Sequence, residues 1–215
     1  MLPNHHIDED MLLAYAAGTL GEAASVLTAA HLSLCPHCRA GVAAAEAVGG
    51  ALLEDIAPAP VSEINVAAFL DRMDAAEAPT SQKTARGDGL LPAPVSNYMS
   101  SDMKSLKWSF VQPGVRFAEL LVDGTGARMG LMHTQPGASI TPHGHSGEEL
   151  TLVLSGGYSC NGQGYRRGDL QSADESTTHE LTTDLDGECL SLVMIRGRIR
   201  PTRWIARILR HFTDF

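Results

Sequence analysis

The sequence predicts a two-domain α+β protein, with an all-α module of four helices followed by an all-β barrel. Residues 1–80 are rich in Ala and Leu and poor in β-branched residues, which favours helices. Residues 98–215 contain short β-rich runs separated by turns that contain Gly. Residues 81–97 have the Pro, Ser, Thr and Gly content of a linker. We therefore expect a helical module (residues 1–80), a linker (81–97) and a β domain with a C-terminal helix (98–215).

Capping residues, prolines and hydrophobic periodicity place four helices in the helical module, at about 8–19, 21–34, 36–56 and 62–77. Asp8 is a suitable N-cap for the first helix, and Pro36 suits the first turn of the third. The fourth helix is amphipathic, and its apolar stripe consists of Val66, Phe69, Leu70 and Met73. Such a stripe is usually part of a core, but a helix isolated by breakers can equally dock on a partner.

The β-rich runs lie at 106–111, 115–122, 128–133, 150–154, 164–170 and 189–195. Short strands with turns at this spacing are typical of a barrel or a sandwich. Residues 201–215 have the pattern of a basic amphipathic helix, which we expect to pack on the barrel or on a dimer partner. Contact with a membrane is the alternative for this helix.

The charge of the chain is unevenly distributed. Residues 1–80 contain eleven Asp and Glu against two Arg, a net charge of −9, whereas residues 81–215 contain fourteen charges of each sign. An acidic module repels nucleic acid and attracts basic surfaces such as those of DNA-binding proteins. A well-solvated helical surface is the simpler interpretation of the same charge. No apolar run is long enough to span a membrane and the start is acidic, so we expect a cytoplasmic protein without direct nucleic-acid binding.

The four cysteines are too few and too unevenly spaced for a disulfide scaffold. Two of them, Cys35 and Cys38, follow His31 in a His-x3-Cys-x2-Cys pattern. Positions 31 and 35 share a helix face, and a turn after Cys35 can return Cys38 to the same point. Two thiolates and one imidazole are three of the four ligands of a structural zinc site.

The fourth ligand of this zinc site must come from the N-terminus, where His5 and His6 are both candidates and His6 is preferred. A thioredoxin-like redox pair is the main alternative, but no strand precedes Cys35 as that arrangement requires. Core cysteines with unrelated histidines are the other alternative. A zinc-bound cysteine pair still reacts with oxidants, so sensing at this site stays open.

These residues resemble the zinc-binding anti-sigma family, whose pattern is a distant His followed by His-x3-Cys-x2-Cys in an N-terminal four-helix module. The resemblance covers about residues 1–80 and matches His6, His31, Cys35 and Cys38. It implies that the module holds an extracytoplasmic-function type sigma factor and blocks its access to RNA polymerase. A DNA-binding partner of this kind agrees with the acidic balance of the module.

A second group of potential ligands lies in the β domain. His143 and His145 alternate on an extended segment and so point to one face, and Glu149 begins the apolar run after them. A fourth ligand must come from a distant strand, and His179 is the well-placed histidine because His211 belongs to the terminal helix. We expect a divalent metal here, zinc first, with iron, manganese or nickel as the other choices. A metal-free barrel with surface histidines is the alternative.

The spacing of this segment matches the first cupin motif, Gly-x5-His-x-His-x3-Glu-x6-Gly, between Gly137 and Gly156, and residues 168–179 resemble its looser second motif. A zinc anti-sigma module before a cupin narrows the resemblance to ChrR-type anti-sigma factors over nearly the whole chain. That resemblance implies release of the sigma factor under singlet oxygen or a related oxidant, with the cupin half required for the response. It implies a regulator and not an enzyme.

We expect the oxidant to act at the metal centre of the β domain or at oxidisable groups near it, namely Cys160, Cys189, Met132 and His133. The rival function is a cupin metalloenzyme of dioxygenase or isomerase type, because three His and one Glu leave metal positions open for substrate or oxygen. No further catalytic acid, base or substrate clamp stands out in the β domain. A metal-storage protein is a third possibility, but it gives the acidic module no task.

Overall fold

The computed structural model of the 215-residue chain describes residues 2–59, 66–75, 90–99 and 102–201. The α-helices among them are α1 (Glu9–Ala16), α2 (Glu22–Leu34), α3 (Pro36–Glu54), α4 (Val66–Ala75) and α5 (Ala93–Ser96), and a 3-10 turn η1 spans Met103–Ser105. Within these residues, no helix is both long enough and apolar enough to cross a membrane.

The ends of the first three helices follow from local chemistry. The Asp8 side chain accepts a hydrogen bond from the Met11 amide and begins α1. Gly18, in the left-handed region with φ 67°, ends it, so α1 is shorter than the sequence predicted. Cys35 is the C-cap of α2 and the N-cap of α3, and Pro36 occupies the first turn of α3. The turn at Cys35 therefore joins α2 directly to α3.

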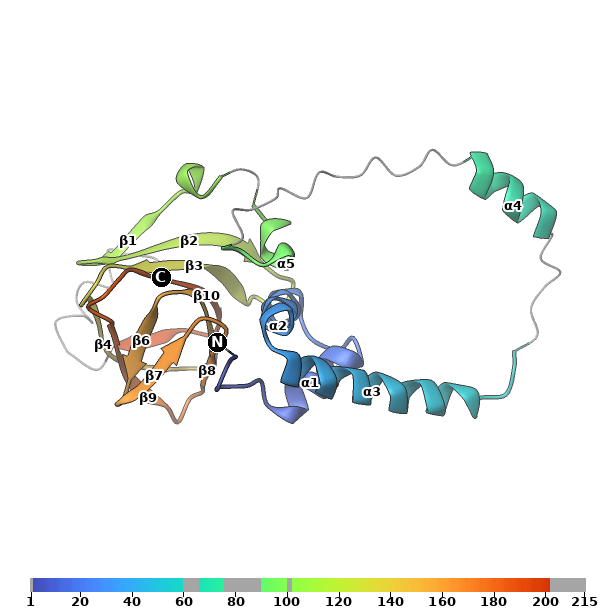
Figure 1. Ribbon diagram of the computed structural model, residues 1–215, viewed down its shortest axis with the longest axis horizontal. Coiled ribbons are helices and arrows are strands. Elements are labelled where there is room, and N and C mark those ends of the chain that lie inside the picture. The colour runs from blue at the N-terminus through green and yellow to red at the C-terminus, as the bar shows by residue number, and fades with distance from the viewer. Residues whose placement is uncertain (1, 60–65, 76–89, 100–101, 202–215) are drawn as a thin grey trace.

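Helix α4 does not pack in the helical module, which was one of the two uses that the sequence left open for its apolar stripe. None of its residues is buried, and Figure 1 shows it well away from α1, α2 and α3. The expected flanks of this helix, residues 60–65 and 76–77, lie outside the described residues. The amphipathic stripe thus finds no core within the described part of this chain.

The β domain consists of β1 (Ser109–Gln112), β2 (Val115–Val122), β3 (Arg128–Thr134), β4 (Ser139–His145), β5 (Glu148–Ser155), β6 (Gly157–Cys160), β7 (Gln163–Arg166), β8 (Leu170–Ala173), β9 (Thr178–Thr183), β10 (Cys189–Arg196) and β11 (Ile199–Pro201). They form a six-stranded sheet of order β1-β2-β3-β10-β5-β8 and a five-stranded sheet of order β11-β4-β9-β6-β7. The pairing within both sheets is antiparallel.

The expected closed barrel is corrected to two separate sheets. Strands β5 and β6 follow each other in the chain but belong to different sheets, because the chain crosses over at Gly156. Its φ of 70° and the adjacent Glu188 carbonyl leave no room for a side chain there. The single strand expected at 164–170 is also wrong: Gly168, with φ 91°, turns the chain between β7 and β8.

The β-rich runs predicted from the sequence did not include β4, β6, β9 or β11. In β4 only His143 and His145 are buried, so this strand lacks the regular alternation of a strand with one buried face. The predicted C-terminal helix lies outside the described residues from 202 onward.

The helices and the six-stranded sheet share one hydrophobic core. Leu27 and Ala30 of α2 belong to the same buried cluster as Leu131 of β3 and Leu192 and Met194 of β10. Figure 1 shows α2 lying at the end of β3 and β10. The helical module is therefore packed directly on the β domain.

The end of the predicted linker is part of this packing. Residues 81–89 lie outside the described residues, but α5 packs on α2, and its Val95 is completely buried. The Tyr98 hydroxyl donates a hydrogen bond of 2.7 Å to Glu22 at the start of α2. Residues 90–98 thus fix the position of α2 from the side of the β domain.

Candidate metal centres

The first site, called here the cysteine site, consists of His6, His31, Cys35 and Cys38. Each residue offers one ligand atom, and these four atoms all lie within 4.8 Å of one another. His31 Nε2 is 3.3 Å from Cys38 Sγ, and His6 Nδ1 is 3.3 Å from Cys35 Sγ. Ligand atoms about 2.0–2.3 Å from a zinc ion lie roughly 3.5 Å apart in a tetrahedron. The spacing of these four atoms fits such an ion.

Three structural elements build the cysteine site. His31 lies in the last turn of α2, Cys35 forms the junction, and Cys38 lies in the first turn of α3. His6 comes from the extended segment before α1, which resolves the choice between two adjacent histidines: His5 points instead to Asp169 of the β domain. His6 is exposed and its ring contacts that of His37, with 4.4 Å between the ring centroids.

The electrostatics of the cysteine site favour a bound cation. His31, Cys35 and Cys38 are fully buried. Burial lowers the pKa of His31 to about 4, while the Gly168 backbone opposes this shift. Burial raises the pKa of the Cys38 thiol to about 11, so ionising it in this environment requires a neighbouring positive charge. A neutral imidazole is ready to bind metal, and two thiolates neutralise a divalent ion.

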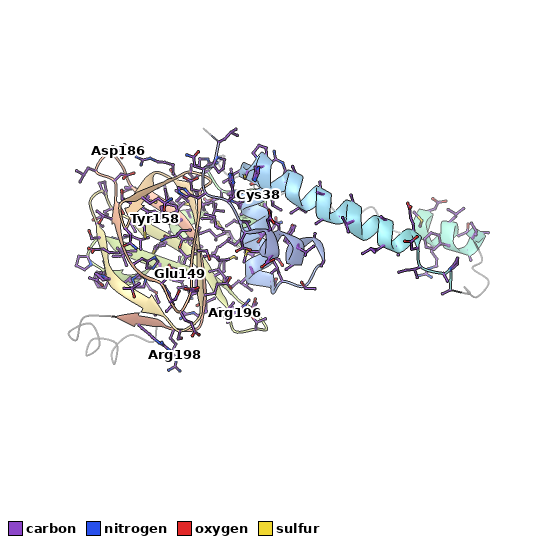
Figure 2. All side chains as sticks on the ribbon, turned by 90° about the horizontal axis from the view of Figure 1, so that it is seen from below. Cys38, Glu149, Tyr158, Asp186, Arg196 and Arg198 are labelled. Atoms are coloured by element: carbon purple, nitrogen blue, oxygen red, sulfur yellow. The ribbon has the colours of Figure 1, made fainter. Side chains whose placement is uncertain are left out.

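The second site, called here the histidine site, consists of His143, His145, Glu149 and His179. All four are buried, and their ligand atoms also lie within 4.8 Å of one another. The first two come from β4, Glu149 from β5 and His179 from β9, so both sheets contribute. Figure 2 shows Glu149 inside the β domain and Cys38 where the helices meet it.

The histidine ring nitrogens converge on one point. His179 Nε2 lies 3.0 Å from both His145 Nε2 and His143 Nε2. One proton serves only one pair of nitrogens at a time, so the convergence fits a shared cation better than an internal hydrogen bond. The His143 Nδ1–H donates to the Thr141 carbonyl at 2.9 Å, which leaves the Nε2 lone pair free for a metal.

Burial determines the charge states in the histidine site. It raises the pKa of Glu149 to about 7 and lowers the pKa of His145 and of His179 to about 4. Burial also lowers the pKa of His143. Three neutral imidazoles and one carboxylate suit zinc, iron, manganese or nickel, and a divalent ion offsets the cost of the buried carboxylate charge.

The two cysteines of the β domain are buried and do not join either site. Cys160 Sγ lies 2.8 Å from Gln171 Nε2, and Cys189 Sγ lies 3.5 Å from the Ser191 hydroxyl. Burial raises the pKa of both thiols, which disfavours the thiolate that oxidants attack. Both belong to a small core with Tyr158 and Tyr165.

The other two oxidisable groups named from the sequence lie on β3, which belongs to the six-stranded sheet. Met132 pairs with Ser191 of β10 and is partly buried. His133 Nε2 lies 3.1 Å from Glu188 Oε2. Neither residue belongs to the histidine site.

Comparisons with known proteins identify the family of this chain. Residues 96–197 match the family described as ChrR Cupin-like domain. The chain is also 36% identical to the anti-sigma-E factor ChrR of Cereibacter sphaeroides, over 99% of each protein. The chain belongs to the ChrR family of anti-sigma factors. This membership supports a regulatory role and not an enzymatic one.

A solved structure of the ChrR family covers both halves of this chain. It is the crystal structure of Rhodobacter sphaeroides SigE in complex with the anti-sigma ChrR. The match has a TM-score of 0.78 and 35% identity, and covers 90% of this chain and 99% of the other. The ChrR family fold therefore extends over the helices and the β domain together.

Sequence reasoning missed three residues that hold this ChrR-family fold and its sites in place. Gln171 contacts His179 Nδ1 at 3.0 Å, Asp169 binds the segment next to His6, and Asp123 caps α2. Asp169 and Asp123 act over at least 100 residues of sequence, and none of the three belongs to a motif that specifies the contact.

Proposed function

We propose that this chain is an anti-sigma factor that holds an extracytoplasmic-function type sigma factor and releases it when its β domain responds to singlet oxygen or a related oxidant. In this proposal residues 1–80 bind the sigma factor and residues 98–215 form the sensor. The chain acts in the cytoplasm because a sigma factor works on RNA polymerase. It makes no direct contact with nucleic acid.

The observation that carries the proposal is the likeness to ChrR over the whole chain. The relative that crystallised with SigE matches 90% of this chain, including both halves. In this chain both predicted ligand sets have ligand atoms close enough for one ion each. A likeness over the helices alone would support only the sigma-binding part of the proposal, and a likeness over the β domain alone would support only the sensing part.

The surface of the helical module suits a basic partner with apolar contacts. The module carries the net charge of −9 described above. The second half of α3 projects away from the body of the molecule, as Figure 2 shows, and carries exposed apolar residues. Together with α4 it leaves eight large apolar side chains at least half exposed, namely Val48, Leu52, Leu53, Ile56, Val66, Phe69, Leu70 and Met73. Docking of these apolar side chains on a partner explains why they lack a core.

We propose zinc for the cysteine site, because two thiolates and two imidazoles in a closed tetrahedron are the usual structural zinc ligands. Its role is to hold the N-terminal segment, α2 and α3 together. For the histidine site we propose a divalent metal, zinc first, with iron, manganese and nickel as the other choices. Its ligands come from both sheets, so a change at this site reaches both sheets.

The proposal is tested by purifying the tagged full chain from its native cells under reducing conditions. Proteins that copurify are identified by mass spectrometry, and metals are counted per chain by elemental analysis. We expect one sigma factor per chain, one zinc and a second divalent metal. We also expect exposure to singlet oxygen to release the sigma factor.

A preparation that carries both metals but no sigma factor would contradict the anti-sigma function. In that case, oxygen uptake with small organic substrates would test the metalloenzyme alternative. A sigma factor that stays bound through the oxidant treatment would contradict the sensing part alone. A matched comparison is the His143→Ala variant, in which oxidant treatment should no longer change sigma-factor binding.

A further inference from the structure

The turn between β7 and β8 binds the N-terminal segment of the chain. Asp169 Oδ1 accepts hydrogen bonds from the backbone N–H of Asn4 at 2.6 Å and of His5 at 2.9 Å. The Leu170 N–H donates to the His5 carbonyl at 3.2 Å. Asp169 is only 2% exposed, and its Oδ2 accepts a further bond from the Arg166 N–H. The residue that precedes His6 is thus held by the β domain.

The same turn also contacts the helical side of the cysteine site. A Cβ on Gly168 would lie 2.7 Å from Pro3 Cγ and 3.5 Å from Leu34 Cβ, so the backbone of this turn packs closely against both residues. Leu34 immediately precedes the ligand Cys35. Residues 168–170 therefore contact both the segment that precedes His6 and the residue that precedes Cys35.

Strand β8, which follows this turn, reaches the histidine site. Gln171 follows Asp169 by two residues, so both side chains lie on the same face of the chain. The Gln171 side chain is buried, and its Nε2 lies 3.0 Å from Nδ1 of His179. Its Oε1 accepts a hydrogen bond of 2.8 Å from the Tyr158 hydroxyl. Residues 169–171 therefore contact both His179 of the histidine site and the segment that carries His6 of the cysteine site.

A row of stacked rings runs beside β8 between the same two end points. Tyr158 stacks on Tyr165 with 5.2 Å between the ring centroids, and Tyr165 contacts His5 at 4.3 Å. Gln163 of β7 also contacts the His5 ring, at 2.7 Å. The rings make the connection stiff, because packed aromatic side chains have little free space in which to move.

The Gln171 amide makes the contact sensitive to the state of His179. When Nε2 of His179 donates its lone pair to a metal, Nδ1 carries the proton and needs an acceptor, which is the amide oxygen. Without the metal, Nδ1 can accept a bond from the amide nitrogen instead. Turning the amide exchanges the groups it offers to Tyr158 and Cys160, which also contact it. The contact therefore has two discrete arrangements, as a coupling element requires.

We propose that residues 166–173 couple the two metal sites, with Gln171 as the positioning residue for His179 and Asp169 as the positioning residue for the segment that carries His6. A change at the histidine site moves β8, loosens the segment at residues 4–6 and exposes the thiols of the cysteine site. This inference rests on the proposed function for its two bound metals and for the purpose of the coupling.

The test measures how fast iodoacetamide alkylates Cys35 and Cys38 in the full chain, by mass spectrometry of the peptide that contains both. Zinc protects these thiols. His143→Ala disables the histidine site without touching the cysteine site. We expect this change to accelerate alkylation about tenfold or more, the size of effect that loss of support around a metal ligand usually has. Zinc content after dialysis provides a second readout.

The coupling predicts that Asp169→Asn removes this response. Asn keeps the size of the side chain but loses the charge and one acceptor oxygen, so alkylation is fast from the start and His143→Ala adds nothing. Gln171→Asn, whose amide is one methylene shorter, tests the opposite end in the same way. Ser172→Ala is the matched control, because Ser172 lies on the same strand but is exposed. That variant should respond like the original chain.

Two results would overturn the coupling. One is unchanged alkylation of Cys35 and Cys38 when His143→Ala is made in the otherwise original chain. The other is an equal acceleration with and without Asp169→Asn in a chain whose circular dichroism shows that it is folded. Binding of the sigma factor is measured on the same preparations. If the chain binds the sigma factor but the two metal sites are not coupled, only the coupling is refuted. If the sites are coupled but no sigma factor binds, only the anti-sigma function is refuted.

Discussion

Asp123 lies in the turn between β2 and β3, yet it caps a helix of the other half of the molecule. Its Oδ2 accepts a hydrogen bond of 3.1 Å from the Ala23 N–H in the first turn of α2. Its Oδ1 accepts bonds from Thr125 and from the Ala127 N–H. Gly21, the N-cap of α2, has no side chain to cap the helix, and a Cβ there would lie 2.9 Å from Asp123 Oδ2. The missing side chain leaves room for the carboxylate.

We expect Asp123→Ala to lower the free energy of unfolding by about 1–2 kcal/mol at neutral pH, the usual effect of removing a helix cap. Hydrogen bonds, first that from the Thr125 side chain and then those from backbone amides, lower the pKa of Asp123 from 3.8 to about 2. A lowered pKa means that the carboxylate stabilises the fold above its unfolded pKa, and that this stabilisation disappears as the pH falls from about 4 to about 2.

Urea denaturation of the original chain and of Asp123→Ala, at pH 7 and again near pH 3, measures this effect. The difference between the two proteins should shrink at the lower pH. A difference that is as large near pH 3 as at pH 7 would show that the carboxylate charge contributes nothing to the cap. Asp186→Ala is a suitable control, because that carboxylate lies on an exposed turn.

At the scale of elements, α3 and α4 leave large apolar side chains exposed. Helix α3 buries only Cys38 and Val42, and α4 buries no residue. Helices in proteins gain most of their stability from packing of an apolar face, so such a face without a core is expected to have a partner. The apolar residues of α4 recur at helical spacing, whereas its remaining positions are small or charged. This pattern belongs to a helix that packs on one side only.

We expect Phe69→Asp in α4 to weaken sigma-factor binding about thirtyfold, because a large aromatic residue in an interface is typically worth about 2 kcal/mol. Phe69 is 53% exposed, so the thermal stability of the free chain should hardly change. Binding of the purified sigma factor by calorimetry measures the first effect, and a thermal melt measures the second. Ala68→Asp adds the same charge on the opposite side of α4 and should bind normally. Equal loss in both variants would indicate a charge effect and not a docking surface.

At the scale of the whole molecule, the two halves are held together by a shared core and by bonds on two sides of it. The core joins α2 to β3 and β10, Asp123 holds the start of α2, and Asp169 holds the N-terminal segment. The cysteine site lies within this contact region and connects the N-terminal segment, α2 and α3. A metal bound there would therefore stabilise both the helical module and the contact between the halves.

We expect Cys35→Ser to lose the zinc of the cysteine site and a large part of the helical circular dichroism signal, while the metal of the histidine site stays bound. We expect helices α1–α3 to depend on the bound zinc, because they bury few large side chains of their own. The strands, in contrast, keep the hydrogen bonds that pair them with their neighbours. Metal analysis and circular dichroism measure the two effects together. A variant that keeps its helical signal after losing this zinc would contradict the structural role of the site.

The sequence by itself determined the residues whose partners are close in the chain. His31, Cys35 and Cys38 meet because one helical turn and a cap bring them together, and His143 and His145 share a face because strand side chains alternate. The same local rules located α1, α2 and α3, with errors of a few residues at their ends. Family resemblance then extended these local patterns to a complete architecture.

Only the tertiary structure decided which distant residues complete and support the sites. It separated His6 from His5, because the β7–β8 turn binds one and leaves the other for the thiols. It replaced the expected barrel by two sheets, and it packed α2 on the six-stranded sheet. Asp123 and Asp169 bind partners at least 100 residues away. Propensity and periodicity act over a few residues, whereas these contacts depend on how complete elements pack, so no local pattern specifies them.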